Sequence, residues 1–178
     1  MYTTRPIQPY TWEKPQFKPY DMAYVLVAAD VADLITQELP NVSVEHIGST
    51  AVQGLPGKGI VDLMVVYPQG LLEEVKKVLE RLGFQKQPQR NPYPESRPMR
   101  VGAYDFMGSL YQLHVHVISN TSPEADELRA FRDRLRYDNN FQMAYSDAKK
   151  AILKSGVYDS TDYAERKSEF IERMTTRR

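Results

Sequence analysis

Three histidines and one aspartate are the side chains of this sequence best suited to chemistry. The only histidines are His46, His114 and His116, and we expect all three on strands. His114 and His116 lie two positions apart in LHVHV, so both point to the same face of a strand. Asp62 interrupts the apolar run VDLMVV, where an unpaired buried carboxylate would be costly. If Asp62 shares that face, the three groups form an N,N,O set of the kind that binds zinc, iron or manganese.

Each of these residues also has a purely structural interpretation. Asp62 could accept backbone hydrogen bonds or pair with Lys58, and the histidines could be hydrogen-bonded, half-buried side chains. His46 is the candidate general base, because an imidazole with a suitable pKa can take a proton from a reacting hydroxyl. The residues alone leave the chemical and the structural interpretation both open.

A glycine-rich loop precedes Asp62 and directly follows a predicted strand. Its residues with phosphate-binding potential are four glycines, a Ser-Thr pair and one lysine: Gly48, Ser49, Thr50, Gly54, Gly57, Lys58 and Gly59. Glycines let backbone N–H groups approach an anion, and the hydroxyls and the ammonium add donors. Neither the Walker spacing nor the dinucleotide fingerprint matches, since no Ser or Thr follows the lysine and a strand comes next. The loop is therefore either a phosphate-binding turn or a structural one.

Basic side chains further along could complete a phosphate site. The segment FRDRLR (131–136) places Arg132 and Arg136 four apart on one helix face, and arginine suits bidentate phosphate contacts. Lys149 and Lys167 lie on the two following predicted helices, and Arg97 comes from a long proline-rich loop. The alternative is a solvated helix face on which neighbouring aspartates pair with the arginines.

Composition restricts the class of protein. The chain has 178 residues, enough for one ordinary domain. Its 23 basic and 23 acidic residues give zero formal net charge, so nucleic-acid binding is not indicated and anion binding must come from local clusters. The absence of cysteine excludes disulfides and thiolate sites. No run approaches the ~18 apolar residues of a membrane span, and the N-terminus has no signal layout, so we expect a cytoplasmic protein.

Periodicity and turn residues predict an α/β (α+β) domain with a mixed sheet and a helical C-terminal part from about residue 123. Residues 1–20, with four prolines and five aromatics, are expected to form an extended arm, and 21–178 a single domain. The expected elements are a helix from Asp21 to 39, strands over 42–47 and 60–67, a helix over 71–82 ended by Gly83, a long loop over 86–99, a hairpin of 100–107 and 111–118 split at Gly108-Ser109, and helices over 123–137, 140–153 and 162–174.

These motifs resemble the GrpB family, which belongs to the nucleotidyltransferase superfamily. The family pattern has a proline where this chain has Gln53, and commonly another after the loop lysine, where Gly59 stands. The matching segments follow family order from about residue 20 to 171 and are HIGSTAVQGLPGKGIVDLMV (46–65), LHVHV (113–117), FRDRLR (131–136), Tyr145 with Lys149, and Tyr163 with Lys167 and Phe170.

The resemblance implies a nucleotidyltransferase-like mixed β-sheet flanked by helices, in which Gly48-Ser49 holds the triphosphate of a nucleotide. In that superfamily, acids two positions apart on the strand bind magnesium ions that activate a hydroxyl and stabilise the departing pyrophosphate. Here Met64 stands at the partner position of Asp62, and a histidine, His114 or His116, replaces the third acid. The hard oxygen ligands that magnesium prefers are thereby reduced to one.

Two functional hypotheses follow. In the first, the protein binds a nucleotide or related phosphate ligand with a divalent metal (Mn, Zn or Mg) at Asp62, His114 and His116, and carries out nucleotidyl or phosphoryl transfer. In the second, it is a non-catalytic nucleotide- or coenzyme A-related binding module. GrpB-like domains fused to dephospho-CoA kinase suggest a functional link to that enzyme. Both hypotheses are compatible with a dimer, and neither involves a membrane.

Overall fold

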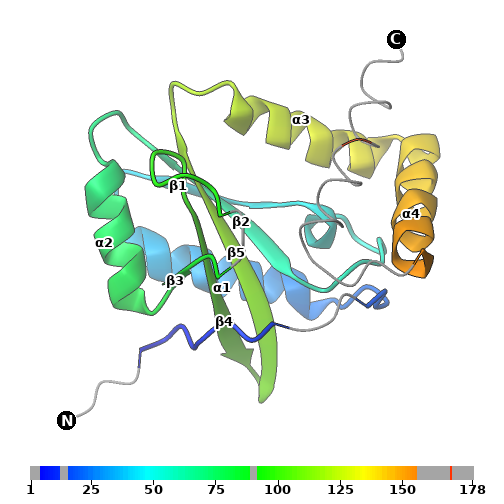
Figure 1. The fold of residues 1–178 in the computed structure, drawn as a ribbon, viewed down its shortest axis with the longest axis horizontal. Coiled ribbons are helices and arrows are strands. Elements are labelled where there is room, and N and C mark those ends of the chain that lie inside the picture. Colours follow the sequence, from blue (N-terminus) through cyan, green and yellow to red (C-terminus); the bar gives the residue numbers. More distant parts are fainter. Residues whose placement is uncertain (1–4, 13–15, 89–91, 156–168, 170–178) are drawn as a thin grey trace.

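The structure is a computed structural model that describes residues 5–12, 16–88, 92–155 and 169. Within these ranges no helix has both the length and the apolar character needed to cross a membrane. The helix predicted over 162–174 lies outside the described residues, apart from position 169. Along the chain the elements are α1 (Ala23–Glu38), β1 (Ser43–Ile47), the short 3-10 helix η1 (Ser49–Ala51), β2 (Val61–Tyr67), α2 (Leu72–Leu82), β3 (Gln85–Lys86), β4 (Met99–Phe106), β5 (Ser109–Ser119), α3 (Glu124–Tyr137) and α4 (Asn139–Lys154) (Figure 1).

The five strands form one mixed sheet in the order β1-β2-β5-β4-β3. Strand β2 runs parallel to β5, and the other three pairings are antiparallel. In this register Asp62 lies opposite His114 and Met64 opposite His116, while Ile47 lies opposite Asp62 on the other side. The predicted mixed sheet flanked by helices is confirmed. Its central pair brings together two motifs that lie about fifty residues apart in the sequence.

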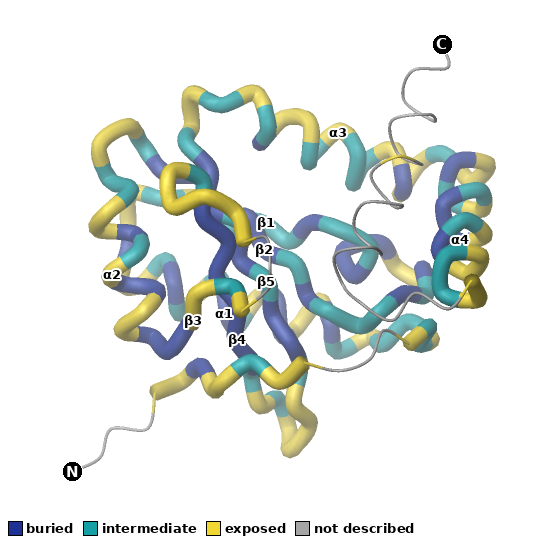
Figure 2. The backbone as a smooth tube through the Cα atoms, viewed as in Figure 1, coloured by how far each residue is buried: buried dark blue, intermediate teal, exposed yellow. Residues whose placement is uncertain are grey.

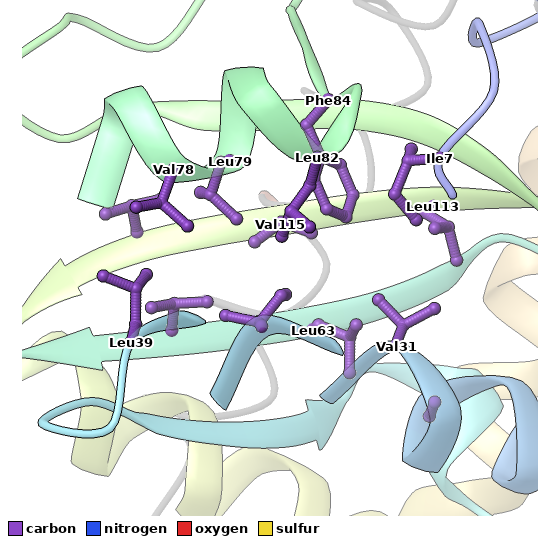
Figure 3. Packing of buried hydrophobic residues seen from close by; sticks show 14 of the residues in the cluster. Ile7, Val31, Leu39, Leu63, Val78, Leu79, Leu82, Phe84, Leu113 and Val115 are labelled. Atoms are coloured by element: carbon purple, nitrogen blue, oxygen red, sulfur yellow. The ribbon is translucent and has the colours of Figure 1, made fainter. Parts of the chain in front are cut away.

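The two faces of the sheet are covered differently. Odd-numbered residues of the central strands, such as Leu63 and Val115, pack against α1 and α2 in the main core (Figure 3). Even-numbered residues such as Met64 and Ile118 form a smaller cluster with Ala125 of α3. Figure 2 shows the resulting buried centre of the sheet. Helix α3 covers only part of this face of the sheet. The even-numbered polar residues of β2 and β5 therefore lie beyond the apolar cluster.

Local sequence signals explain most element boundaries. The Asp21 carboxylate accepts a hydrogen bond from the Ala23 amide at 2.9 Å just ahead of α1, and Gly83 ends α2 with a left-handed φ of 116°. The hairpin turn was predicted one residue too late. It is Met107-Gly108, both with positive φ (53° and 80°) as in a type I′ turn, and β5 already begins at Ser109.

Strand β3 was missed by sequence reasoning, which placed its second residue in a long loop. Gln85 and Lys86 pair with Val101 and Arg100 of β4. A two-residue strand shows too few alternations for a period of two to be visible in the sequence. The loop between β3 and β4 is correspondingly shorter than predicted.

The N-terminal arm packs on its own domain. Gln8 and Ala103 exchange backbone hydrogen bonds of 2.8 and 2.9 Å, so the arm continues the edge of β4. Ile7, 2% exposed, enters the main core beside α2 (Figure 3). Further along, Lys18 and Gly57 exchange bonds of 2.7 and 3.0 Å. The arm therefore contacts both the sheet edge and the glycine loop.

Gly83→Ala tests how firmly the arm is docked, because a Cβ at Gly83 would lie 2.1 Å from the Ile7 carbonyl oxygen. Gly70→Ala is the matched control, since it also has a positive φ but nothing within 4 Å. We expect the control to cost about 1 kcal/mol of unfolding free energy from backbone strain alone. Gly83→Ala should cost about 3 kcal/mol, because the buried Ile7 must also move. Equal losses in urea denaturation would contradict this view of the arm.

Candidate functional site

The candidate site lies where the glycine loop leaves β1 and passes the start of β2. Asp62 Oδ1 is 3.4 Å from His114 Nδ1 and 3.9 Å from His116 Nε2. The three side chains are 13–23% exposed, and alternation along the strands places all of them on the α3 face of the sheet. The structure therefore brings together the aspartate and the histidine pair that the sequence singled out.

Gly48 closes the other side of the Asp62 carboxylate. Its backbone has φ 71° and ψ −166°, a conformation that is essentially restricted to glycine. A Cβ at this position would lie 2.7 Å from Asp62 Oδ2. The turn from β1 into η1 thus needs glycine both for its backbone conformation and for the space beside the carboxylate.

The local environment sets the charges of this cluster. Burial raises the pKa of Asp62, but the neighbouring His114 and His116 outweigh burial and hold that pKa well below its usual range. Burial lowers the pKa of His116, against the opposing effect of Asp62. Near neutral pH the carboxylate is therefore ionised and the His116 ring is neutral.

Arg97, from the loop before β4, fixes the orientation of His116. Its Nη1 lies 3.1 Å from His116 Nδ1. A guanidinium only donates, so Nδ1 accepts and the proton of the neutral ring is on Nε2, facing Asp62. Arg97 is itself bonded to Glu124, the first residue of α3, through Nε–Oε2 at 2.8 Å and a second contact. The site is thereby tied to the start of α3.

The cluster in this arrangement is a carboxylate flanked by two histidines at ion-pair distances. Among the residues that the structure describes, no set of three or more His, Cys, Asp or Glu side chains is arranged to hold a metal ion. His116 Nε2 can coordinate a metal only if its proton moves, because a metal binds the unprotonated nitrogen. His114 Nε2, in contrast, is buried without a hydrogen-bond partner. The metal site therefore stays a prediction from the types of the donor side chains.

The glycine loop carries a second polar group, a serine bonded to a buried lysine. Lys149 Nζ of α4 donates to Ser49 Oγ at 3.1 Å, and Lys149 is only 3% exposed. Gly57 lies against both, since a Cβ there would be 2.7 Å from Nζ and 3.0 Å from Oγ. Of the other two predicted phosphate-binding lysines, Lys58 lies between η1 and β2, and Lys167 lies outside the described residues.

The structure places His46 away from the Asp62 cluster. His46 lies opposite Leu63, a residue of the main core, so alternation directs it to the other face of the sheet. Its Nε2 is 2.9 Å from Thr50 Oγ1, which also bonds the Ile60 carbonyl at 3.3 Å. Burial lowers the pKa of His46 to about 4. His46 and Thr50 thus bond each other at the glycine loop, and their roles as general base and as phosphate donor stay predictions.

The two arginines predicted to bind phosphate hold α3 against β1 and η1. Arg136 donates to the Ala51 carbonyl through Nη2 at 2.9 Å and Nε at 3.2 Å. Arg132 bonds Asp133 at 2.8 Å and Glu45 of β1 at 3.2 Å. The hydrogen bonds from Arg129 and Arg132 lower the pKa of Glu45 against the opposing effect of burial. The alternative of acid–arginine pairing is therefore what the structure shows for this helix face.

Sequence reasoning also missed two tyrosines that contact the histidines. The Tyr10 ring lies 5.6 Å from His114 and the Tyr93 ring 5.8 Å from His116, between centroids. Both tyrosines come from proline-rich segments, where no periodicity indicates which way a side chain points. The density of prolines in the long loop was the one available signal that this segment has a special role.

Comparison with solved structures identifies the class of fold. The Cid1 poly(U) polymerase, in a crystal structure with Mg 3′-dATP bound, matches with a TM-score of 0.50 and 13% identity, over 73% of this chain and 41% of that chain. The conserved protein GrpB from Enterococcus faecalis matches with a TM-score of 0.65 and 24% identity, over 90% of this chain and 99% of that one. At these identities the likeness shows the fold alone, which is nucleotidyltransferase-like.

Sequence comparison identifies the family. The family model described as GrpB protein matches residues 14–177. The UPF0157 protein SCO7215 of Streptomyces coelicolor is 34% identical over 138 residues, which are 77% of this chain and 69% of that protein. The UPF0157 protein PA4798 of Pseudomonas aeruginosa is 33% identical over 140 residues, and this chain spans only 56% of its length. The chain belongs to the GrpB family.

The lowered pKa of His46 predicts a specific pH dependence of stability. The unfolded state binds the proton more readily than the folded state, so stability is complete above the ordinary pKa of 6.5 and falls as the pH decreases towards about 4. We expect a loss of up to about 3 kcal/mol from this group. His46→Gln keeps a partner for Thr50 but does not titrate, so urea unfolding between pH 7 and pH 4.5 should be less pH-dependent in this variant. Identical pH profiles for the two proteins would contradict the assignment.

Proposed function

We propose that this GrpB-family protein binds a nucleotide or related phosphate ligand at the glycine loop, with the phosphates at Gly48, Ser49 and Lys149. The observation that carries the proposal is the Ser49–Lys149 contact of 3.1 Å beside Gly57. It places a hydroxyl and a buried ammonium next to each other at the glycine loop. The preceding residue, Gly48, is packed against the Asp62 carboxylate, so a ligand bound at Ser49 would lie beside the ionised acid.

A phosphate suits this pair of groups better than a neutral ligand does. Removing an ammonium from water is costly unless strong acceptors surround it. Lys149 is 3% exposed, donates to the hydroxyl of Ser49 and also lies 5.1 Å from the centroid of the Tyr145 ring. An anionic oxygen would give Lys149 a charge-assisted hydrogen bond and leave the Ser49 hydroxyl free to donate to the same ligand. A ligand oxygen would therefore add a charged partner to the contacts that Lys149 already makes.

A divalent metal at Asp62, His114 and His116 is the second part of the proposal. One carboxylate and two imidazoles suit manganese or zinc better than magnesium. A metal bound there would polarise a phosphoryl oxygen, as nucleotidyl or phosphoryl transfer requires. The chain's own groups have separate tasks: Gly48 positions the carboxylate, and Arg97 determines which nitrogen of His116 carries the proton.

A non-catalytic nucleotide- or coenzyme A-related binding module is the second candidate function, and Met64 favours it. Met64 occupies the position two residues after Asp62, and it is fully buried in the cluster under α3. No second carboxylate is therefore available at that position to hold another metal ion. A single acid is sufficient to bind a ligand, whereas two-metal transfer uses more.

Lys149→Met tests the phosphate site, with Lys150→Met as the matched control on the same helix. Lys150 is 46% exposed and pairs with Asp147. In calorimetric titrations with ATP and with inorganic tripolyphosphate, we expect Lys149→Met to weaken both ligands at least about tenfold, because a charge-assisted hydrogen bond is lost. Ser49→Ala should weaken both several-fold and Lys150→Met neither. Unchanged affinity in a folded Lys149→Met variant would refute the proposed site.

Asp62→Asn tests the metal and the reaction. Thermal shifts with ATP in EDTA, Mg²⁺, Mn²⁺ and Zn²⁺ should show additional stabilisation by Mn²⁺ or Zn²⁺ in the wild type that Asp62→Asn lacks. Equal shifts in EDTA and in every metal would remove the metal from the proposal and leave phosphate binding intact. Release of pyrophosphate or phosphate from ATP over hours favours the enzyme, and binding without either product favours the second candidate.

A further inference from the structure

Tyr93 has the surroundings of a stacking platform. Its ring is nearly perpendicular to that of His116, at 83°. The Arg97 guanidinium carbon lies 4.6 Å from the Tyr93 ring centroid, so the cation covers one ring face. The residue nevertheless stays 44% exposed. An aromatic side chain that is supported from one side and open to solvent at the edge of a site is suited to contact a flat ligand group.

The segment that carries Tyr93 is anchored on both faces of the sheet. Arg97 is bonded to Glu124 of α3 and to His116. Glu95 accepts two hydrogen bonds, of 2.9 and 3.1 Å, from Arg100, which is 1% exposed. This pairing with Arg100, against the opposing effect of burial, lowers the pKa of Glu95 to about 2. A ring held this way needs little further ordering when a ligand packs on it.

The position of Tyr93 relative to the proposed phosphate site fits the dimensions of a nucleotide. The Ser49–Lys149 pair follows β1, Asp62 is on β2, and His116 with its Tyr93 contact is on β5. These strands are neighbours, so β1 and β5 are two strand spacings apart, roughly 10 Å, with the phosphate pair next to one and Tyr93 next to the other. An extended nucleoside polyphosphate reaches across such a distance, with its phosphates at one end and its base at the other.

We infer that Tyr93, supported by Arg97, is the base-stacking residue of this site, so the ligand is a nucleoside polyphosphate and not a polyphosphate alone. This inference rests on the proposed function and adds the class of ligand and a specificity-determining residue to it. It holds for both candidate functions, because a nucleotide substrate and a coenzyme A-related ligand each carry a base. Stacking uses the π-face that every base has, so Tyr93 alone should discriminate only weakly between purines and pyrimidines.

The test compares two ligands on three variants by calorimetric titration. ATP and tripolyphosphate share the phosphates and differ in the nucleoside. We expect Tyr93→Leu to weaken ATP about tenfold or more while tripolyphosphate binds as it does to the wild type. Tyr93→Phe should retain ATP binding, because the ring remains. Tyr137→Leu, at a tyrosine that is 84% exposed at the end of α3, is the matched control and should change neither ligand.

The outcomes separate this inference from the proposed function. Full ATP affinity in Tyr93→Leu, or equal weakening of both ligands, would overturn base stacking while phosphate binding stands. Failure of both ligands to bind the wild type would overturn the proposed function and this inference together. Ribose 5-triphosphate, which lacks a base, tests base stacking on the wild-type protein without a mutation. If Tyr93 stacks a base, this baseless ligand should bind the wild type like tripolyphosphate, and ATP-like affinity would overturn the inference.

Discussion

The parallel register of β2 and β5 is the constraint on which the site depends. It sets Asp62 opposite His114 and Met64 opposite His116. A slip of one residue would turn one of these sets to the other face of the sheet, because side chains alternate with a period of two. The register is fixed from the other side by the apolar odd-numbered residues of both strands, which fill the core against α1 and α2. The polar cluster is thus positioned by hydrophobic packing on the face of the sheet that it does not occupy.

Ion pairs hold the elements around the Asp62, His114 and His116 cluster together. Glu45 joins β1 to two arginines of α3, and Arg97 joins the loop before β4 to the start of α3 through Glu124. Arg136 bonds the last carbonyl of η1. Helix α3 is therefore a common support for the glycine loop and for the loop that carries Tyr93. The arginines of α3 are bonded to Glu45 and to the Ala51 carbonyl, whereas Lys149 of α4 contacts the Ser49 hydroxyl of the glycine loop.

The sequence was sufficient for the fold class and for much of the polar cluster. The alternation in LHVHV placed both histidines on one face, and the buried run around Asp62 identified a central strand, since both depend on local periodicity. The sequence did not show whether these two strands were neighbours, because strand pairing depends on residues that lie far apart in the chain. The partners of the α3 arginines could not be predicted, because spacing shows that two side chains share a helix face but not what that face meets. The side of the sheet that His46 faces could not be predicted either, since a single residue near a strand end carries no periodic signal for it.

The burial of Met64 has an evolutionary consequence. A two-acid site would need a carboxylate at this position, in a cluster formed by Ile47, Val66, Ile118 and Ala125. A single substitution to aspartate would place a charge among these apolar side chains and leave a void where the longer methionine had been. Several packing residues beneath α3 would have to change together before such a variant folded well. The one-acid arrangement is thus maintained by the core, and selection on folding alone would preserve it after any demand on the chemistry had ceased.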